Sequence, residues 1–276
     1  MHEVKGHKIR LLAILLLFGI LLCGCGLQNH VYTETELKKV AEKSLHKKYN
    51  EEFIIHNVWS KNQDVFYADC SPKDNAEIVV RADVSKNGKG VEADGYVRAI
   101  VSQEAKELLE QDFQANFSNC FTRAIVGGYY KQPLVDNVDT VKLHEYINDY
   151  TEQVGINCDI VYEIFIPDID NSEESIRKEY EFLSRTLVEQ VDKKIASNTI
   201  LDIKVDLFFV DEEMLKEIIK YFGTSTGIKG EFDREMRKYQ NVVCIYKDRK
   251  IEMNYTEYEE QRSQYKRYEE LRKKNK

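Results

Sequence analysis

The feature that most constrains this chain is an eleven-residue segment, residues 156–166, in which apolar and polar side chains alternate. A period of two is typical of a β-strand, because successive side chains point to opposite faces of a sheet. A strand with one apolar and one polar side fits a sheet that has one buried and one solvated face. The apolar side consists of Ile156, Cys158, Ile160, Tyr162, Ile164 and Ile166, and the polar side includes Asn157, Asp159 and Glu163.

The residues before this segment predict a helix, three strands and a second helix. Thr33 and Glu36 form a capping-box pattern, which predicts a helix over residues 33–49. The period then changes, and short turn clusters such as Ser60-Lys61-Asn62 separate the predicted strands, so neighbouring strands should be antiparallel. The predicted strands cover residues 53–59, 64–70 and 77–84, and the second helix covers residues 96–116.

The second half repeats the mixture of helices and strands. A helix over residues 141–153 precedes the alternating strand, and Asn171 is the predicted N-cap of the helix after it. A further strand over 201–209, a helix over 211–222 and a hairpin over 241–254 follow.

These patterns predict an α+β fold, with antiparallel sheets and helices packed on one face of each. Residues 127–140 are weakly patterned and contain Pro133, so they are the predicted linker between two units. The predicted organisation is a first unit over 33–126, a linker over 127–140, a second unit over 141–254 and a charged C-terminal helix or tail over 255–276.

The N-terminus has the layout of a secretory signal peptide. Lys5, Lys8 and Arg10 precede an apolar run over residues 11–22. Twelve apolar residues are too few for a comfortable permanent span, which needs about 20. Cleavage, rather than a lasting membrane helix, is therefore the prediction.

The run ends in Leu22-Cys23-Gly24-Cys25, which resembles the lipobox of bacterial lipoproteins. The resemblance implies a signal peptide over 1–24, cleavage before Cys25, a diacylglyceryl group on its thiol and a tether over 25–32. Modification of Cys23 would instead place Leu22 next to the cut, where a small residue is required. The resemblance thus implies a protein held by lipid on the extracytoplasmic face of the cell membrane, with Cys25 as its lipidation site.

Removal of residues 1–24 takes away three basic residues and one acidic residue, so the net charge of −8 becomes −10. An acidic chain of this kind is a poor nucleic-acid binder, because such binding needs clustered cations. The segment Lys48-Tyr49-Asn50-Glu51-Glu52-Phe53 and the Lys/Glu/Tyr/Asn-rich composition are similar to uncharacterised lipoproteins of low-GC Gram-positive bacteria.

Four cysteines follow Cys25, and their pairing is left open: Cys70, Cys120, Cys158 and Cys244. An exported set of four allows three disulfide connectivities. The apolar neighbours of Cys158 and Cys244 favour small core side chains instead. The absence of a C-x-x-C pair from the sequence argues against a thioredoxin-like or zinc-knuckle role.

No catalytic, cofactor or metal site is predicted. The histidines His46, His56 and His144 lie far apart in the sequence and lack a ligand spacing such as H-E-x-x-H. The acidic segment 168–174 is explained by helix capping rather than by calcium. Asp159 and Glu163 would stand roughly 13 Å apart, at about 3.3 Å per residue, and a solvated sheet face is the preferred interpretation.

The C-terminal residues 255–276 contain 12 charged side chains and a row of tyrosines at helical spacing. They predict a partly docked helix, with a partner-binding arm as the alternative. For the whole chain the leading hypothesis is a non-enzymatic envelope lipoprotein that binds another protein, a cell-wall component or a small ligand. The alternatives are a surface hydrolase with a dispersed active site and an accessory subunit of a membrane complex.

Overall fold

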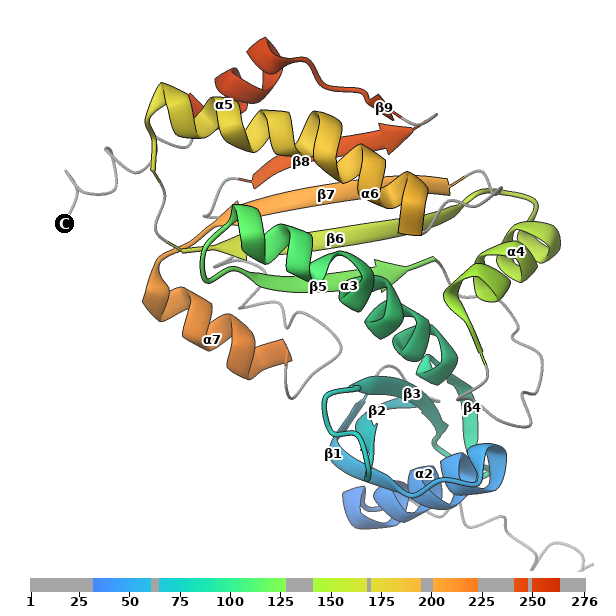
Figure 1. Cartoon of the computed structure of the whole chain (residues 1–276). Coiled ribbons are helices and arrows are strands. Elements are labelled where there is room, and N and C mark those ends of the chain that lie inside the picture. Colours follow the sequence, from blue (N-terminus) through green and yellow to red (C-terminus); the bar gives the residue numbers. More distant parts are fainter. Residues whose placement is uncertain are drawn as a thin grey trace, which may run out of the picture.

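The computed structural model describes residues 32–60, 65–127, 141–167, 170–194, 201–222, 241–247 and 250–263. In this part of the chain the strands form two sheets and helices pack against them (Figure 1). The α+β class predicted from the sequence is confirmed. Cys25, the signal peptide and nearly all of the predicted linker 127–140 lie outside the described residues. No described helix is both long and apolar enough to span a membrane.

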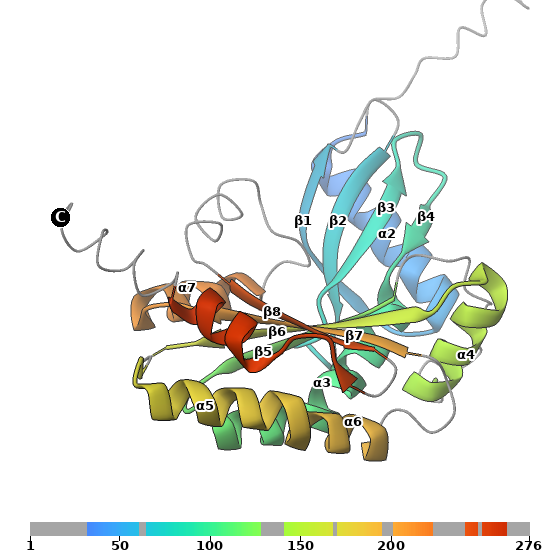
Figure 2. The same cartoon turned by 90° about the horizontal axis from the view of Figure 1, so that it is seen from above.

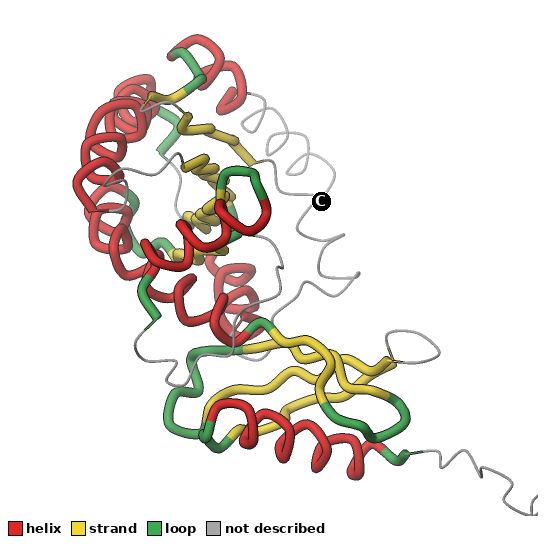
Figure 3. The backbone as a smooth tube through the Cα atoms, turned by 90° about the vertical axis from the view of Figure 1, so that its right-hand side faces the viewer, coloured by secondary structure: helices red, strands yellow, loops and turns green. Residues whose placement is uncertain are grey.

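The first sheet is a four-stranded antiparallel meander in chain order, and one helix covers one of its faces (Figure 3). That helix, α2 (Glu34–Tyr49), begins with the predicted capping box: Glu36 N donates to Thr33 Oγ1, and Thr33 N donates to Glu36 Oε2. It buries Leu37, Ala41 and Leu45 against the sheet. The strands are β1 (Phe53–Ser60), β2 (Val65–Pro72), β3 (Val80–Ser85) and β4 (Val91–Asp94).

The second sheet contains five strands in chain order, and one neighbouring pair is parallel. The sequence analysis predicts antiparallel sheets and is wrong for this pair, β6 with β7. The helical crossover between them is long enough to return the chain to the same end of the sheet, which parallel pairing requires. The strands are β5 (Phe121–Val126), β6 (Cys158–Ile166), β7 (Leu201–Phe209), β8 (Asn241–Lys247) and β9 (Lys250–Ile251).

The helix α3 (Tyr96–Asn116) connects the two sheets and packs mainly along β5. The strand β5, which the sequence analysis did not identify, pairs with β6. The strand β5, which lies within the predicted first unit 33–126, belongs to the second sheet. The buried side of β5 carries Thr122 and Ala124, so the strand has no apolar alternation to reveal it.

Helices cover both faces of the second sheet, whereas the sequence analysis predicts one face (Figure 2). On one face lie α3 and the crossover helix, which consists of α5 (Glu173–Glu181), the π-helical turn η2 (Phe182–Thr186) and α6 (Leu187–Lys194). On the other face, α7 (Glu212–Phe222) packs Leu215 and Ile218 against Phe165. The helix α4 (Leu143–Val154) lies against α3 and the beginning of β6 and ends at Gly155, whose φ is 76°.

The described part of the C-terminal segment, residues 255–263, is helical and docks on α5. Tyr258 and Arg262 are buried, with exposed fractions of 0% and 1%. The Arg262 guanidinium donates to both carboxylate oxygens of Glu179, at 2.8 and 2.9 Å, and its carbon lies 4.0 Å from the ring centre of Phe209. This segment is therefore part of the core, and residues 264–276 lie outside the described residues.

Candidate functional site

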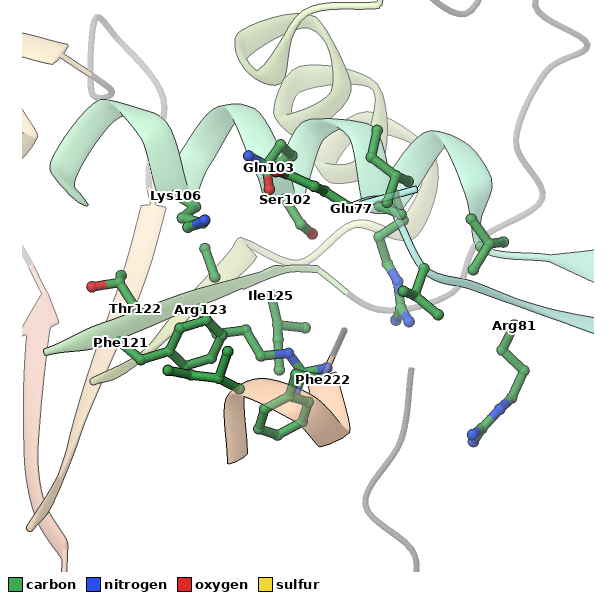
Figure 4. Close-up of a pocket in the computed structure, with 18 residues that line it drawn as sticks. Glu77, Arg81, Ser102, Gln103, Lys106, Phe121, Thr122, Arg123, Ile125 and Phe222 are labelled. Carbon is green, nitrogen blue, oxygen red and sulfur yellow. The ribbon is translucent and has the colours of Figure 1, made fainter. Parts of the chain in front are cut away.

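A cavity of about 400 Å³ lies where the two sheets meet (Figure 4). Its walls are the segment that leads into β3, the first half of α3, the strand β5 and the end of α7. A volume of this size is in the range of small-ligand sites in proteins. The cavity is therefore the candidate site of the described chain.

The cavity is rich in cations although the chain as a whole has a net charge of −8. Its lining contains four basic side chains, Arg81, Arg98, Lys106 and Arg123, and one acidic side chain, Glu77. Ser102, Gln103 and Thr122 add polar groups, while Phe121, Ile125, Ile219 and Phe222 supply apolar surface. A lining of this kind suits a ligand that is anionic and partly apolar.

One stripe of α3 supplies part of the polar wall. Arg98, Ser102 and Lys106 recur every four residues, so they lie on the same side of the helix. Val97, Val101 and Ala105 stand one residue before them and, with Leu109, form an apolar stripe that is buried. Burial of this apolar stripe orients the polar stripe toward the cavity. The Lys106 ammonium also pairs with Glu110 at 3.5 Å.

The strand β5 supplies Arg123, which lies on the side of the strand away from α3. The Arg123 guanidinium donates to Glu163 Oε2 at 3.1 Å and lies 4.3 Å from the ring centre of Phe222. Burial raises the pKa of Glu163, the negative charge of Asp206 adds to the rise, and the Arg123 charge opposes it. The side chain of Glu163 is only 15% exposed, so the solvated face proposed for it from the sequence is wrong at this residue. Asp159 does lie exposed on that face.

Arg81 links the cavity to the open face of the first sheet. Its Nε donates to Asp69 Oδ1 at 3.2 Å, and Asp69 has no exposed surface. Its guanidinium carbon also lies 4.9 Å from the ring centres of both Trp59 and Tyr67. These contacts fix the cation at one end of the cavity, where Figure 4 shows it apart from the other labelled side chains.

The backbone of β5 also borders the cavity. Among the described residues β5 pairs with β6 alone, so its other side is an edge. Val126 N donates to Ser102 Oγ at 3.0 Å, which shows that the amide of Val126 points to this edge. Because backbone groups of an antiparallel strand alternate in direction, Thr122 and Ala124 present their N–H and C=O groups to the same edge.

The residues considered as sites from the sequence do not converge. His46 Nδ1 is within hydrogen-bond distance of Glu51 O, His56 Nε2 is within that distance of Ser71 Oγ, and His144 is exposed on α4. The described residues contain no group of histidine, cysteine and acidic side chains arranged to hold a metal ion.

The acidic segment 168–174 is described in part and belongs to a helix cap. The N-cap is Ser172, whose Oγ accepts from Ser175 N, and not Asn171 as predicted. Asn171 Oδ1 instead accepts from Arg262 Nη1 at 3.2 Å. The Asp170 carboxylate accepts from the backbone N–H and the hydroxyl of Ser172, and these bonds lower the pKa of Asp170.

The four cysteines that the structure describes are free and buried: Cys70, Cys120, Cys158 and Cys244. Burial raises the pKa of each thiol, to about 12 for Cys158 and for Cys244. A raised pKa suppresses the thiolate, which is the nucleophilic form. These cysteines are therefore core side chains, and none of them lines the cavity.

Comparison with known proteins gives likeness of fold. A DUF5037 family protein from Ruminococcus gnavus ATCC 29149 matches 82% of this chain and 98% of its own, with a TM-score of 0.62 and 12% identity. A DUF1672 family protein from Staphylococcus aureus subsp. aureus Mu50 matches 62% of this chain and 78% of its own, with a TM-score of 0.33 and 14% identity. No protein-family model and no curated protein matches the sequence.

The first of these likenesses shows a shared fold, and the second is too weak to support an argument. The body of the chain therefore resembles, in fold, an uncharacterised protein of a low-GC Gram-positive bacterium, in keeping with part of the resemblance drawn from the sequence. The lipid anchor stays a prediction.

Sequence reasoning missed the cavity because its four cations come from three separate segments. Arg81 lies on β3, Arg98 and Lys106 on α3, and Arg123 on β5. The one available signal was the polar stripe of α3, in which two of the four cations recur at helical spacing.

Proposed function

We propose that this chain is a lipid-anchored, extracytoplasmic protein that binds an anionic ligand in the cavity between α3 and β5. The observation that carries the binding proposal is the excess of cations in that cavity on an acidic chain. The anchoring proposal rests on the lipobox-like sequence Leu22-Cys23-Gly24-Cys25 after a short apolar run.

The position of the cations favours binding of an anion. Two unit charges 4 Å apart attract by about 1 kcal/mol in water and by about 4 kcal/mol near a protein surface of lower effective dielectric constant. Lys106 and Arg81 have side chains that are 22% and 24% exposed. Cations so placed attract an anion more strongly than fully hydrated ones do.

The same lining supports binding rather than catalysis. Its side chains include neither a histidine nor a cysteine, and Glu77 is its one carboxylate. General acid–base and nucleophilic catalysis most often use such groups in contact with the substrate. Ser102 and Lys106 can also serve in such chemistry, but Ser102 Oγ accepts from Val126 N and Lys106 pairs with Glu110. The polar groups of this cavity instead suit the orientation of a charged ligand, in a protein that the lipid holds at the membrane surface.

The anchor is tested by labelling with a fatty acid and by the intact mass of the mature N-terminus. Each buried methylene contributes about 0.8 kcal/mol, and stable anchoring takes two acyl chains, which a diacylglyceryl group supplies. We expect Cys25→Ser to abolish the label and release the protein from membranes. The matched control, Cys23→Ser, should keep both. A wild-type protein that is unlabelled, or that begins elsewhere than at Cys25, would contradict the anchor.

The cavity is tested by thermal unfolding of the mature protein, purified from membranes, with inorganic phosphate, dodecanoate and triglutamate. A ligand at 100 times its Kd stabilises the folded state by about 2.7 kcal/mol. We expect at least one of these anions to raise Tm in the wild type and in the control Lys89→Glu, and to have little effect on Lys106→Glu. Lys89 is exposed in the turn between β3 and β4, so its reversal makes the same change in net charge outside the cavity. If none of the anions raises Tm, the binding proposal fails.

A further inference from the structure

We infer that the ligand is an extended peptide segment with acidic side chains, which adds to the edge of β5 as a further strand. This inference rests on the proposed function and specifies the class of its ligand. The cavity follows five of the six residues of β5, since residues 121–125 line it. Five residues of a strand extend about 16 Å at 3.3 Å per residue, so the edge accepts a segment of about that length.

The backbone of β5 supplies the first part of the argument. Within the described chain its outer edge has no pairing strand, and the N–H and C=O groups of Thr122 and Ala124 face that edge. An edge of this kind is a template for a strand from another chain, because main-chain hydrogen bonds form without regard to sequence. Ser102 Oγ occupies the edge at Val126, so the open stretch ends there.

The side chains on the two faces of β5 supply the second part. A strand added to this edge would direct alternate side chains to the two faces. Figure 4 shows Ser102, Gln103 and Lys106 on the α3 side of β5, and Arg123 and Phe222 on the other side. A peptide in which acidic residues face Lys106 and apolar residues face Phe222 complements both faces.

Charge also argues against a second copy of this chain as the occupant. A symmetric pairing of β5 with β5 of another copy brings together two edges that both carry lysine and arginine. Like charges across neighbouring strands are destabilising. An acidic peptide meets the same cations with favourable charge, so the occupant is a partner segment of opposite sign.

The test uses fluorescein-labelled acetyl-Val-Glu-Val-Glu-Val-amide and fluorescence anisotropy with the mature, lipidated protein in detergent micelles. We expect saturable binding, at least tenfold weaker binding to Lys106→Glu, and unchanged binding to Lys89→Glu. The peptide with lysine in place of each glutamate should bind at least tenfold more weakly than the parent. Circular dichroism confirms that each variant is folded, and Lys106→Gln gives a milder change at the same position.

Two N-methylated isomers of the peptide distinguish strand addition from simple charge attraction. In a strand the direction of the N–H groups alternates from residue to residue, so one of the two isomers loses its bonds to β5: one is methylated at both glutamates and the other at the second and third valines. We expect one isomer to bind at least tenfold more weakly than the other. Equal affinities of the two isomers would contradict strand addition, as would tight binding of the lysine peptide or no binding of the parent.

The outcome also separates this inference from the proposed function. If phosphate or dodecanoate stabilises the protein through Lys106 while the Val-Glu peptide does not bind, the cavity is an anion site and strand addition is wrong. If none of the anions and none of the peptides binds, both proposals are wrong.

Discussion

The two sheets of this protein differ in what covers their second faces. In the first sheet, α2 covers one face, and the described residues of the other include partly exposed aromatic side chains around Arg81 and the buried Asp69. In the second sheet, helices lie on both faces, and the C-terminal segment adds a buried arginine, Arg262, against α5. Both sheets thus hold a buried carboxylate with an arginine, but one arginine is in contact with water and the other is not.

This contrast predicts how much each arginine contributes to stability. A carboxylate that loses its partner costs more free energy the less water can enter the space that the partner leaves. Asp69 is paired with an arginine that is 24% exposed, whereas Glu179 is paired with one whose side chain has no exposed surface. The predictions below test this difference, from the largest effect to the smallest.

The largest effect is expected for Arg262→Ala. It leaves Glu179 buried without its two guanidinium bonds, and breaking a buried pair in this way costs about 3–5 kcal/mol. Urea unfolding of the mature protein measures the loss. Lys178→Ala removes an exposed partner of Glu174 on the same helix and should leave the midpoint unchanged. Equal stability of Arg262→Ala and the wild type would show that residues 255–263 do not pack as described.

A smaller loss is expected for Arg81→Ala. Asp69 loses one bond, but water can enter from the open face, so the cost should be that of an unsatisfied acceptor, about 1–3 kcal/mol. The same urea experiment gives the comparison. A loss larger than that of Arg262→Ala would reverse the expected order and would mean that the open face of the first sheet is as dry as the core.

The pH dependence of the free energy of unfolding should show a further property of the second sheet, because Glu163 lies on its strand β6. The pKa of Glu163 is raised in the folded state, so the folded protein binds this proton more tightly than the unfolded chain does. Its contribution to stability is therefore largest at low pH and is lost as pH rises from the ordinary glutamate pKa through the raised pKa of the folded state. We expect Glu163→Gln to flatten this decline in urea unfolding between pH 4 and 7. Identical slopes for the two proteins would contradict it.

Part of the slope should remain in Glu163→Gln. The pKa of Asp159, on the same strand, is also raised, first by burial and then by the charge of Asp202. Asp159→Asn in the Glu163→Gln background should therefore flatten the curve further. A slope unchanged by this second substitution would assign the remaining dependence to groups elsewhere.

The smallest effect concerns the thiols, which should behave alike in both sheets. Cys70 lies in the first sheet, and Cys158 and Cys244 lie in the second, with Cys120 just before it; all four are buried. We expect no reaction with a thiol reagent in the folded mature protein and four equivalents after unfolding in guanidinium. Rapid reaction of one thiol before unfolding would reveal an opening of the sheet that contains it.

The sequence predicted most of the elements and the α+β class, because periodicity and caps are local signals. The capping box of Thr33 and Glu36 and the alternation over residues 156–166 both correspond to observed elements. The strand β5 was missed because its buried face contains a threonine and an alanine, and the parallel pairing of β6 with β7 depends on where a long crossover returns.

The cavity could not be predicted from sequence in the same way. Its cations are adjacent because β5 pairs with β6 and α3 crosses from one sheet to the other, and both are long-range contacts. Arg262 is a similar case: in the sequence it is one charge among twelve in the C-terminal segment, and its burial depends on Glu179, 83 residues earlier.

The π-helical turn at Phe182–Thr186 sets the rotation of the helix that follows it. Leu183, Leu187 and Val191 recur every four residues, and a step of four residues is longer than one α-helical turn of 3.6 residues. A turn with i→i+5 bonds holds one more residue and offsets that overshoot. Loss of one residue there would rotate α6 by about 100°. The rotation would turn its apolar side chains away from the sheet and separate Asp192 from the Tyr246 hydroxyl, now 2.6 Å apart. The alignment of α6 with β8 thus depends on the residue count of one turn.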